Sequence, residues 1–294
     1  MTTLVSQKTE TGLFNLSYMT RRKIARVLIY VILVMFCLIS MYPMVIMVLN
    51  SFKSNNEIFV NPAGLPNEWT LESYASIFNS HTGLWRNYIV SIIVAVSTTL
   101  GSVFLSALAA FSFAKFKFRG RNIIFAALLA TMMVPTELSI PGQYLLFAEL
   151  QLLNSIPALV LPKLTPIIGL FLIRQYMLSI PDALIESARI DGANYFTIFW
   201  RIMVPVSAPI LGAFAILTFM ASWNDYLWPS IVILQQDIQP IMIVLPRLTD
   251  ETGFQKVWGT IMAGNTLATI PIMLVFIKYQ DRFMSSMTVG AVKE

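Results

Sequence analysis

The feature that most constrains this chain is a run of mostly apolar residues from Ile24 to Leu49. A helix needs about 20 such residues to cross the hydrocarbon core of a bilayer, and several later runs are of similar length. Charged residues make up 12% and hydrophobic residues 56% of the 294 residues, whereas soluble domains are about 25% charged. The sequence therefore predicts an integral membrane protein and excludes a soluble globular domain.

Apolar runs predict an all-α protein with six transmembrane helices, over Ile24–Leu49, Tyr88–Ala114, Ile123–Leu146, Ala158–Met177, Pro205–Leu234 and Gly259–Tyr279. The fifth run is expected to be helical over only part of its length. Proline pairs interrupt the third and fourth runs, at Pro135 and Pro141 and at Pro162 and Pro166. Because each proline removes a backbone donor and loosens the helix, these breaks indicate either a translocation path or ordinary packing kinks.

Basic residues between the runs predict the orientation in the membrane. One cluster precedes the first run and another follows the second, at Arg21, Arg22, Lys23 and Arg26 and at Lys115, Lys117, Arg119 and Arg121. Since cytoplasmic loops carry an excess of Lys and Arg, both clusters are expected inside, and 15 of the 20 Lys and Arg residues then face the cytoplasm. We expect both termini in the cytoplasm, with an N-terminal segment over 1–23, one membrane domain over 24–279 and a tail over 280–294.

The residue inventory also limits partners and chemistry. Nucleic acid is not expected as a partner, because the basic residues lie between apolar runs rather than along one face of a polar domain. Cys37 is the only cysteine and His81 the only histidine, so the chain lacks the ligands of a typical zinc site and a His, Cys and carboxylate constellation for catalysis. We predict no catalytic site and no metal site. Lys163 is expected to extend its ammonium towards the outer interface.

The loop over 179–204, between the fourth and fifth runs, is predicted to form two short helices with a sharp turn. Ser179 is expected to cap the first helix and Asn194 the second, while Gly192 ends the first in a left-handed conformation. Helical spacing gives the first helix a polar and an apolar face, with Asp182, Glu186 and Arg189 on one and Leu184, Ile185 and Ala188 on the other. Such a helix is either a docking element or an interfacial helix on lipid headgroups.

This loop resembles the EAA loop of the permeases of binding-protein-dependent ABC importers. The resemblance rests on an acidic residue, two small residues, a glycine at a fixed offset and a distal Ile-x-x-Pro, here Glu186, Ser187, Ala188, Gly192, Ile202 and Pro205. Ser187 departs from the usual second alanine but is small enough for the same groove. Further matches point to the carbohydrate-uptake branch of the maltose-permease type, at Phe52-Lys53, Asn87, Phe116 to Arg121, Phe171 to Gln175, Trp223 to Asp225 and Thr288 to Lys293.

The resemblance implies a type I ABC importer permease in the bacterial cytoplasmic membrane. Two permeases would form the pathway, two separate ATPase subunits would bind ATP and Mg, and an extracytoplasmic solute-binding protein would deliver a sugar or oligosaccharide. This chain would be one permease, non-catalytic and without a cofactor, surrounded by membrane lipid; it contains no glycine-rich phosphate-binding sequence. The implied ATPase-coupling residues are Glu186, Ser187, Ala188, Asp191, Gly192 and Pro205.

A second group of candidate residues lies within the fifth run, at Trp223, Asn224, Asp225 and Tyr226. An ionisable residue within a span is costly and usually faces the bundle interior or water. These side chains offer hydrogen bonds to sugar hydroxyls beside aromatic faces, so we place them in the substrate pathway, although a helix-breaking or subunit-contact role fits equally well. The outer loop over 235–257 resembles the loop that reaches into the solute receptor of this family.

The main alternative function is a secondary transporter driven by an ion gradient. Such a transporter would need membrane-embedded carboxylates or broken-helix ion sites, and it often shows an inverted repeat. Asp225, Glu137 and Glu149 are the candidate carboxylates, and no repeat is apparent. This alternative leaves the EAA-like loop unexplained.

Overall fold

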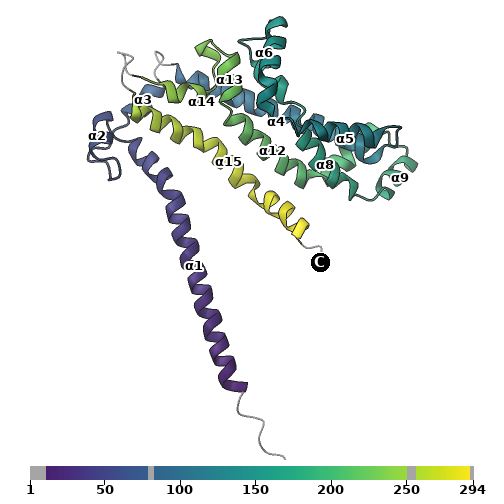
Figure 1. Cartoon of the computed structure of the whole chain (residues 1–294), viewed down its shortest axis with the longest axis horizontal. Helices are drawn as coiled ribbons and strands as arrows, with labels where there is room; N and C mark the ends of the chain where they lie inside the picture. The colour runs from purple at the N-terminus through teal and green to yellow at the C-terminus, as the bar shows by residue number, and fades with distance from the viewer. Residues whose placement is uncertain (1–10, 79–82, 250–255, 292–294) are drawn as a thin grey trace, which may run out of the picture.

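The computed structural model describes residues 11–78, 83–249 and 256–291. Within these ranges the protein is helical, and the β-structure consists of one isolated bridge between Thr249 and Lys256. Four helices dominate, namely α1 (Thr11–Asn50), α4 (Leu84–Lys115), α12 (Ala208–Trp223) and α15 (Trp258–Ala291). Figure 1 shows α4, α12 and α15 side by side and α1 projecting away from them.

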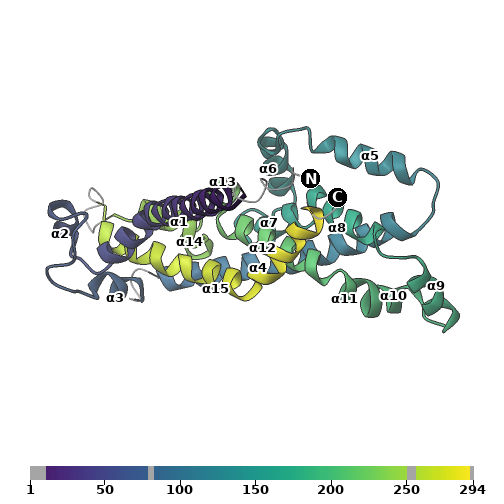
Figure 2. The same ribbon diagram turned by 90° about the horizontal axis from the view of Figure 1, so that it is seen from below.

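Shorter helices connect and complete these four. They are α2 (Asn55–Val60), α3 (Glu72–Phe78), α5 (Arg121–Thr131), η1 (Thr136–Ser139), α6 (Ile140–Glu149), α7 (Ile156–Val160), η2 (Leu161–Lys163), α8 (Ile167–Leu178), α9 (Ala183–Ile190), α10 (Tyr195–Ile198), η3 (Phe199–Met203), α11 (Val204–Val206), α13 (Leu227–Val232), η4 (Gln236–Ile238), α14 (Ile241–Val244) and η5 (Leu245–Arg247). Segments α2 and α3 lie at one end of the molecule and α9 at the other, as both Figure 1 and Figure 2 show.

Four helical segments of the described chain are long and apolar enough to cross a membrane, and the number rises to six if each of two bent helix pairs forms one span. These six agree in position with the six predicted runs. The terminal helices are longer than expected: α1 begins at Thr11 rather than at Ile24, and α15 continues to Ala291, through most of the expected tail.

Helix α4 forms the centre of the bundle and packs against α8 and α12. Small residues also allow α8 and α12 to approach each other closely, because a Cβ on Gly169 of α8 would lie 2.2 Å from Cζ of Phe214 in α12. Ala107 and Ala110 of α4 are buried in the same cluster, together with Ile173 of α8. Small residues at helix contacts are typical of membrane bundles.

The third and fourth spans are broken, as the prolines predicted. Segments Arg121–Thr131 and Thr136–Glu149 meet at 91°, and Ile156–Lys163 and Ile167–Leu178 meet at 44°. Pro135 has a non-helical ψ of 132° and Pro166 one of 125°, so each marks a break. Pro141 instead occupies the first turn of α6, where a missing N–H costs nothing, and its expected interruption is therefore wrong.

The fifth predicted span is helical over part of its length, as expected. Helix α12 ends at Trp223 and α13 begins at Leu227, so a short non-helical link carries Asn224 to Tyr226. The backbone N–H of Asn224 still donates to the carbonyl of Met220, at 3.1 Å. Helical hydrogen bonding then stops and resumes in α13, which places Asp225 at a break in the span.

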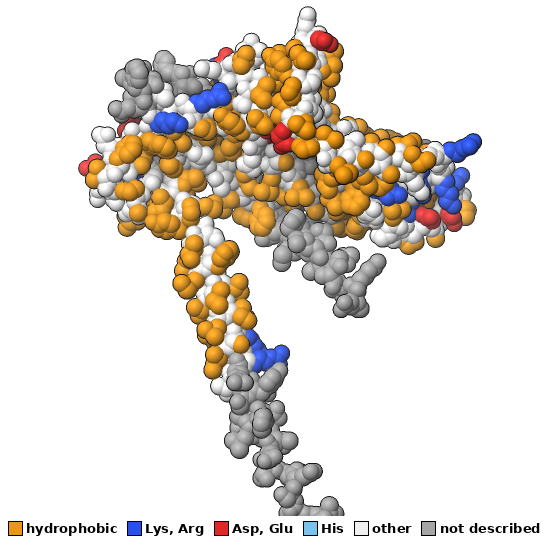
Figure 3. Space-filling view, viewed as in Figure 1, with side chains coloured by type: hydrophobic (Ala, Val, Ile, Leu, Met, Phe, Trp, Pro, Cys, Tyr) orange, Lys and Arg blue, Asp and Glu red, His pale blue; other side chains and the backbone are white. Residues whose placement is uncertain are grey.

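Helix α1 is exposed along its apolar stretch, where none of the residues is buried. It contacts α15. Figure 3 shows hydrophobic side chains along α1 and Lys and Arg side chains at its lower end. Exposed apolar area of this extent, in a protein of this composition, faces lipid or another membrane subunit.

Candidate functional site: the coupling loop and the membrane cavity

The loop over 179–204, here called the coupling loop, has the two predicted helices. Helix α9 (Ala183–Ile190) ends before Gly192, whose φ of +84° is left-handed as expected. Oδ1 of Asn194 accepts a hydrogen bond from the N–H of Thr197 at 2.8 Å, so Asn194 caps α10 as predicted. The expected cap at Ser179 is wrong, because its hydroxyl donates back to the carbonyl of Tyr176 at 2.7 Å.

Helix α9 rests on the bundle through a narrower apolar face than its sequence predicted. Ile185 is buried and Ala188 packs against the same cluster as α4, α8 and α12. Leu184, expected on this face, is 44% exposed, because the face is only one residue wide per turn and Leu184 is rotated about 100° from Ile185. Leu184 therefore lies on the predicted apolar side of the helix but does not pack on the bundle.

The outward surface of the coupling loop mixes charged and apolar side chains. Of the six coupling residues inferred from the sequence, all except the half-buried Ala188 are exposed, namely Glu186, Ser187, Asp191, Gly192 and Pro205. Large apolar residues are exposed beside them: Leu184, Ile190, Tyr195, Phe196 and Trp200. A cluster of apolar and charged groups at the end of a bundle is suited to binding another protein. Pro205 lies in α11, outside this surface, where the loop re-enters the membrane domain through the π-helix η3.

A lysine at the end of α4 fixes the base of the loop. Nζ of Lys115 donates to the carbonyl of Ile180 at 2.5 Å and to Oδ1 of Asp182 at 2.7 Å. This hydrogen bond and the lysine charge lower the pKa of Asp182 below its usual value. Sequence reasoning assigned Lys115 only to the basic cluster that sets orientation, so this contact was missed. A second contact links the two loop helices, because the guanidinium of Arg189 lies 5.3 Å from the ring centre of Tyr195.

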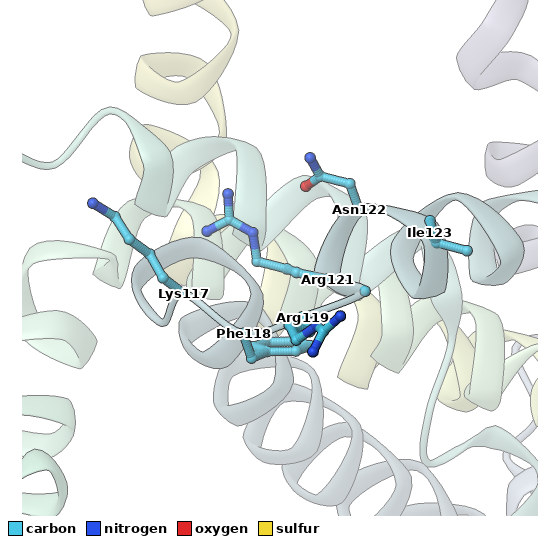
Figure 4. Close-up of a pocket in the computed structure, with 7 residues that line it drawn as sticks. Lys117, Phe118, Arg119, Arg121, Asn122 and Ile123 are labelled. Carbon is cyan, nitrogen blue, oxygen red and sulfur yellow. The ribbon is translucent and has the colours of Figure 1, made fainter.

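A basic pocket of about 500 Å³ lies in the turn between α4 and α5, lined by residues 117–123. Figure 4 shows Lys117 and Arg121 extending from this turn in a direction different from that of Arg119. Nη1 of Arg121 donates to the carbonyl of Phe116 at 3.1 Å, and the charge of Lys117 further lowers the pKa of Asp182. The turn therefore contributes positive potential beside the coupling loop.

A larger cavity of about 860 Å³ lies among the broken spans. Its walls come from α4, the α5–α6 break, the region from η2 to α8, and the region from α12 to α13. The polar residues lining it are Thr98, Thr131, Thr136, Glu137, Gln143, Lys163, Thr165, Thr218, Ser222 and Asp225. This volume is within the roughly 300–1,000 Å³ typical of small-molecule sites.

Only one of the four residues proposed for the substrate pathway lines this cavity, and that residue is Asp225. Trp223 is buried, and its Nε1–H donates to the carbonyl of Ala268 in α15 at 3.1 Å. Nδ2 of Asn224 donates to Met220 O at 2.9 Å, and Tyr226 is 45% exposed. The side chains of this segment therefore point in different directions: Trp223 into the contact with α15, and Tyr226 onto the exposed surface.

Asp225 forms an ion pair with Lys163, whose ammonium contacts Oδ2 of the carboxylate. Lys163 thus has a carboxylate partner in the cavity wall, and its expected extension towards the outer interface stays a prediction. The two side chains are 25% and 18% exposed. Thr98 and Ser222 add buried hydroxyls that lack a hydrogen-bond partner within the described part of the chain.

The segment after α13, part of the loop expected to reach a solute receptor, packs closely on α4. Nδ2 of Asn87 donates to the carbonyls of Gln236 and Gln239, at 2.9 and 2.7 Å. Ile241 is fully buried. The tip of this loop, over 250–255, lies outside the described residues. Among the described residues, no group of three His, Cys, Asp or Glu side chains is placed to hold a metal ion.

Comparison with known proteins decides the family. Residues 102–289 match the family described as "Binding-protein-dependent transport system inner membrane component", a range that includes the coupling loop, the cavity lining except for Thr98, and most of α15. The chain belongs to this family. It is therefore a multi-pass inner membrane permease, and the family resemblance found in the sequence is confirmed.

Relatives of this permease cover almost all of its length. It is 32% identical over 271 residues to the arabinooligosaccharides transport system permease protein AraQ of Bacillus subtilis (strain 168), across 91% of this chain and 96% of AraQ. It is 29% identical over 261 residues to the sn-glycerol-3-phosphate transport system permease protein UgpE of Yersinia pestis bv. Antiqua (strain Antiqua), across 87% of this chain and 93% of UgpE.

The fold also matches a solved structure of an ABC importer. A chain in the crystal structure of a bacterial ABC transporter involved in the import of the acidic polysaccharide alginate superposes with a TM-score of 0.79 and 22% identity. The match covers 89% of this permease and 97% of that chain. The predicted all-α importer permease fold is thereby confirmed.

Proposed function

We propose that this permease is one of two that together form the pathway of a carbohydrate importer, driven by ATP hydrolysis on separate ATPase subunits. The observation that carries the proposal is the coupling loop, with its left-handed Gly192, its exposed Glu186 and its anchor to α4 through Lys115. The names of the relatives support a sugar or oligosaccharide as substrate, since AraQ belongs to an arabinooligosaccharide system.

The coupling residues have distinct roles in this proposal. Glu186 meets a basic or hydrogen-bonding group of the ATPase, and Ser187 and Ala188 allow close approach because their side chains are small. Asp191 and Gly192 form the turn between the loop helices; at a φ of +84°, a residue with a Cβ is disfavoured. Pro205 begins the return into the membrane.

The cavity of about 860 Å³ is the proposed passage for the sugar. Hydroxyl-rich solutes need many hydrogen-bonding partners, and the cavity wall offers threonine, serine, glutamine and charged side chains. Asp225 is the proposed contact within the segment from Trp223 to Tyr226. Trp223 and Asn224 would fix the conformation of this segment, because they donate hydrogen bonds to carbonyls of α15 and α12. Tyr226 would contact a neighbouring subunit or lipid.

The remaining partners follow from exposed surfaces and from the family. The exposed apolar side of α1 is proposed to contact the second permease as well as lipid. An extracytoplasmic solute-binding protein would deliver the sugar at the end of the molecule that carries α2 and α3. ATP and Mg would bind to the ATPase subunits, and this chain would hold no cofactor and catalyse no reaction.

The test is sugar-stimulated ATPase activity of the complete complex in proteoliposomes, with arabinotriose, maltotriose and maltose as test sugars. We expect Glu186→Lys to reduce the stimulation by about tenfold or more, because breaking a charged contact at an interface costs about 2–5 kcal/mol. Glu149→Lys, at an exposed glutamate of α6 outside the coupling loop, is the matched control and should retain stimulation. Uptake that follows an ion gradient without ATP would instead support a secondary transporter.

A further inference from the structure

Two helices of the cavity wall are joined by the coupling loop. Helix α8 runs into the loop and α12 leaves it, so their loop-side ends are linked by the chain. Lys163 ends η2, and three residues separate it from the start of α8 at Ile167. Asp225 lies two residues after the end of α12 at Trp223. The ion pair between them therefore closes the end opposite the coupling loop.

Close packing between α8 and α12 makes these two helices move together. Gly169 of α8 allows contact with the ring of Phe214, and Leu170 and Ile173 share a buried cluster with Leu211 of α12. The 12 residues of α8 extend about 18 Å at 1.5 Å per residue, and Lys163 lies beyond the end of α8 that is farther from the loop. Motion of the loop would reach the cavity wall through these two helices.

Both charged residues sit where helical hydrogen bonding is interrupted. The fourth span bends by 44° between Lys163 and Ile167, and Asn224 to Tyr226 separate α12 from α13. A span bends most easily at a break in its helix. Movement of the coupling loop would therefore not pass beyond the break unless a contact connected the segments there. The ion pair supplies that link, and its partial burial limits screening by salt.

Other bonds hold the outer segments together independently of the ion pair. Nε1 of Trp228 in α13 donates to the carbonyl of Ala158 in α7 at 2.8 Å. Oδ1 of Asn154 accepts from the N–H of Leu234 at 2.6 Å. Loss of the ion pair therefore leaves α7 and α13 attached, so the local fold does not depend on Lys163 and Asp225 alone.

We propose that Lys163 and Asp225 are positioning residues that hold η2, at the break before α8, to the link that follows α12, so that movement of the coupling loop changes the shape of the cavity. This inference rests on the proposed importer function. Loss of either charge lets the two linked segments shift relative to each other, although α7 and α13 stay attached, and ATP hydrolysis then continues while the cavity responds less. The expected signature is less sugar transported for each ATP hydrolysed.

The experiment compares Lys163→Met, Asp225→Asn and the double variant in the complete reconstituted complex. The radiolabelled sugar is the one among arabinotriose, maltotriose and maltose that most stimulates the ATPase activity of the wild type. The measured quantity is the amount of this sugar taken up for each ATP hydrolysed in the same vesicles. The amount of assembled complex is measured by copurification of its subunits. Glu149→Gln removes an exposed carboxylate of α6 that lies outside the cavity lining and is the control for charge loss.

We expect each single variant to assemble normally and to transport about tenfold less sugar per ATP, within the range of couplings measured between contacting charged residues. The double variant should lose no more than either single variant, because the same contact is broken. Three outcomes would overturn the inference. The single variants could transport as much sugar per ATP as the wild type, or their uptake and ATPase activity could fall together with the amount of assembled complex. The double variant could also lose more sugar transport per ATP than either single variant. Absence of sugar stimulation in the wild type would instead refute the proposed function.

Discussion

Helices α1 and α4 are both long and apolar, but only α4 is built for contact with other helices of its own chain. In the most apolar stretch of α4, 39% of the residues are buried, against none in α1. Small and hydroxyl residues line the buried side of α4, among them Ser102, Ser106, Ala107 and Ala110. Apolar character places both helices in the membrane, whereas small side chains decide which of them packs inside the protomer.

The largest expected effect comes from enlarging a small residue on the packed side of α4. Ala110 is fully buried, so Ala110→Leu forces its neighbours apart and should destabilise the protein by about 1–3 kcal/mol. The measurement is the thermal midpoint of helix loss in detergent. Ala25→Leu, on exposed α1, is the matched change and should stay within about 0.5 kcal/mol; equal losses at both sites would remove the distinction between the helices.

A smaller effect tests what covers α1. Phe36 is 70% exposed, and if the second permease packs there, Phe36→Ala should weaken association by about 1 kcal/mol through lost van der Waals contact. The yield of the second permease that copurifies with this chain should fall, while the thermal midpoint of the isolated chain stays constant. Unchanged association would mean that lipid alone covers this part of α1.

The smallest expected effect is a change in the pKa of Asp182 on loss of a lysine. It is tested at two lysines of the basic clusters, Lys115 at the end of α4 and Lys23 in α1. Because Lys115 lowers the pKa of Asp182, their contact stabilises the loop fully above the unfolded-state pKa of the carboxyl group and is lost as pH falls through the lower folded-state pKa. In Lys115→Met the pKa of Asp182, followed by carbon NMR of its labelled carboxylate, should rise towards the usual aspartate value. Lys23→Met should leave it unchanged; the same shift in both variants would contradict a local contact.

Sequence patterns predicted the elements better than the contacts between them. The membrane runs, the left-handed Gly192 and the cap at Asn194 follow from local composition and backbone preference, and they were found as expected. The Lys163–Asp225 pair joins residues 62 positions apart, and no local pattern specifies which of the cavity's polar groups Lys163 meets. The same limit explains Lys115, whose partner Asp182 lies 67 positions away.

Local reasoning also failed where two local solutions compete. Ser179 can cap a following helix or bond back to the preceding turn, and it does the second, at Tyr176. Leu184 and Ile185 are equally apolar, but only Ile185 reaches the bundle. In both cases the outcome depends on how the coupling loop is seated against α4 and α8, which is a property of the whole bundle.

The length of α4 also sets the distance between the membrane and the coupling loop. Its 32 residues extend about 48 Å at 1.5 Å per residue, whereas the hydrocarbon core is about 30 Å thick. An upright α4 therefore protrudes by several residues into the headgroup layer, and Lys115 at its last position attaches the loop there. In the proposed importer, α4 would therefore act as a spacer that lets an ATPase subunit bind the loop without contact with the lipid surface.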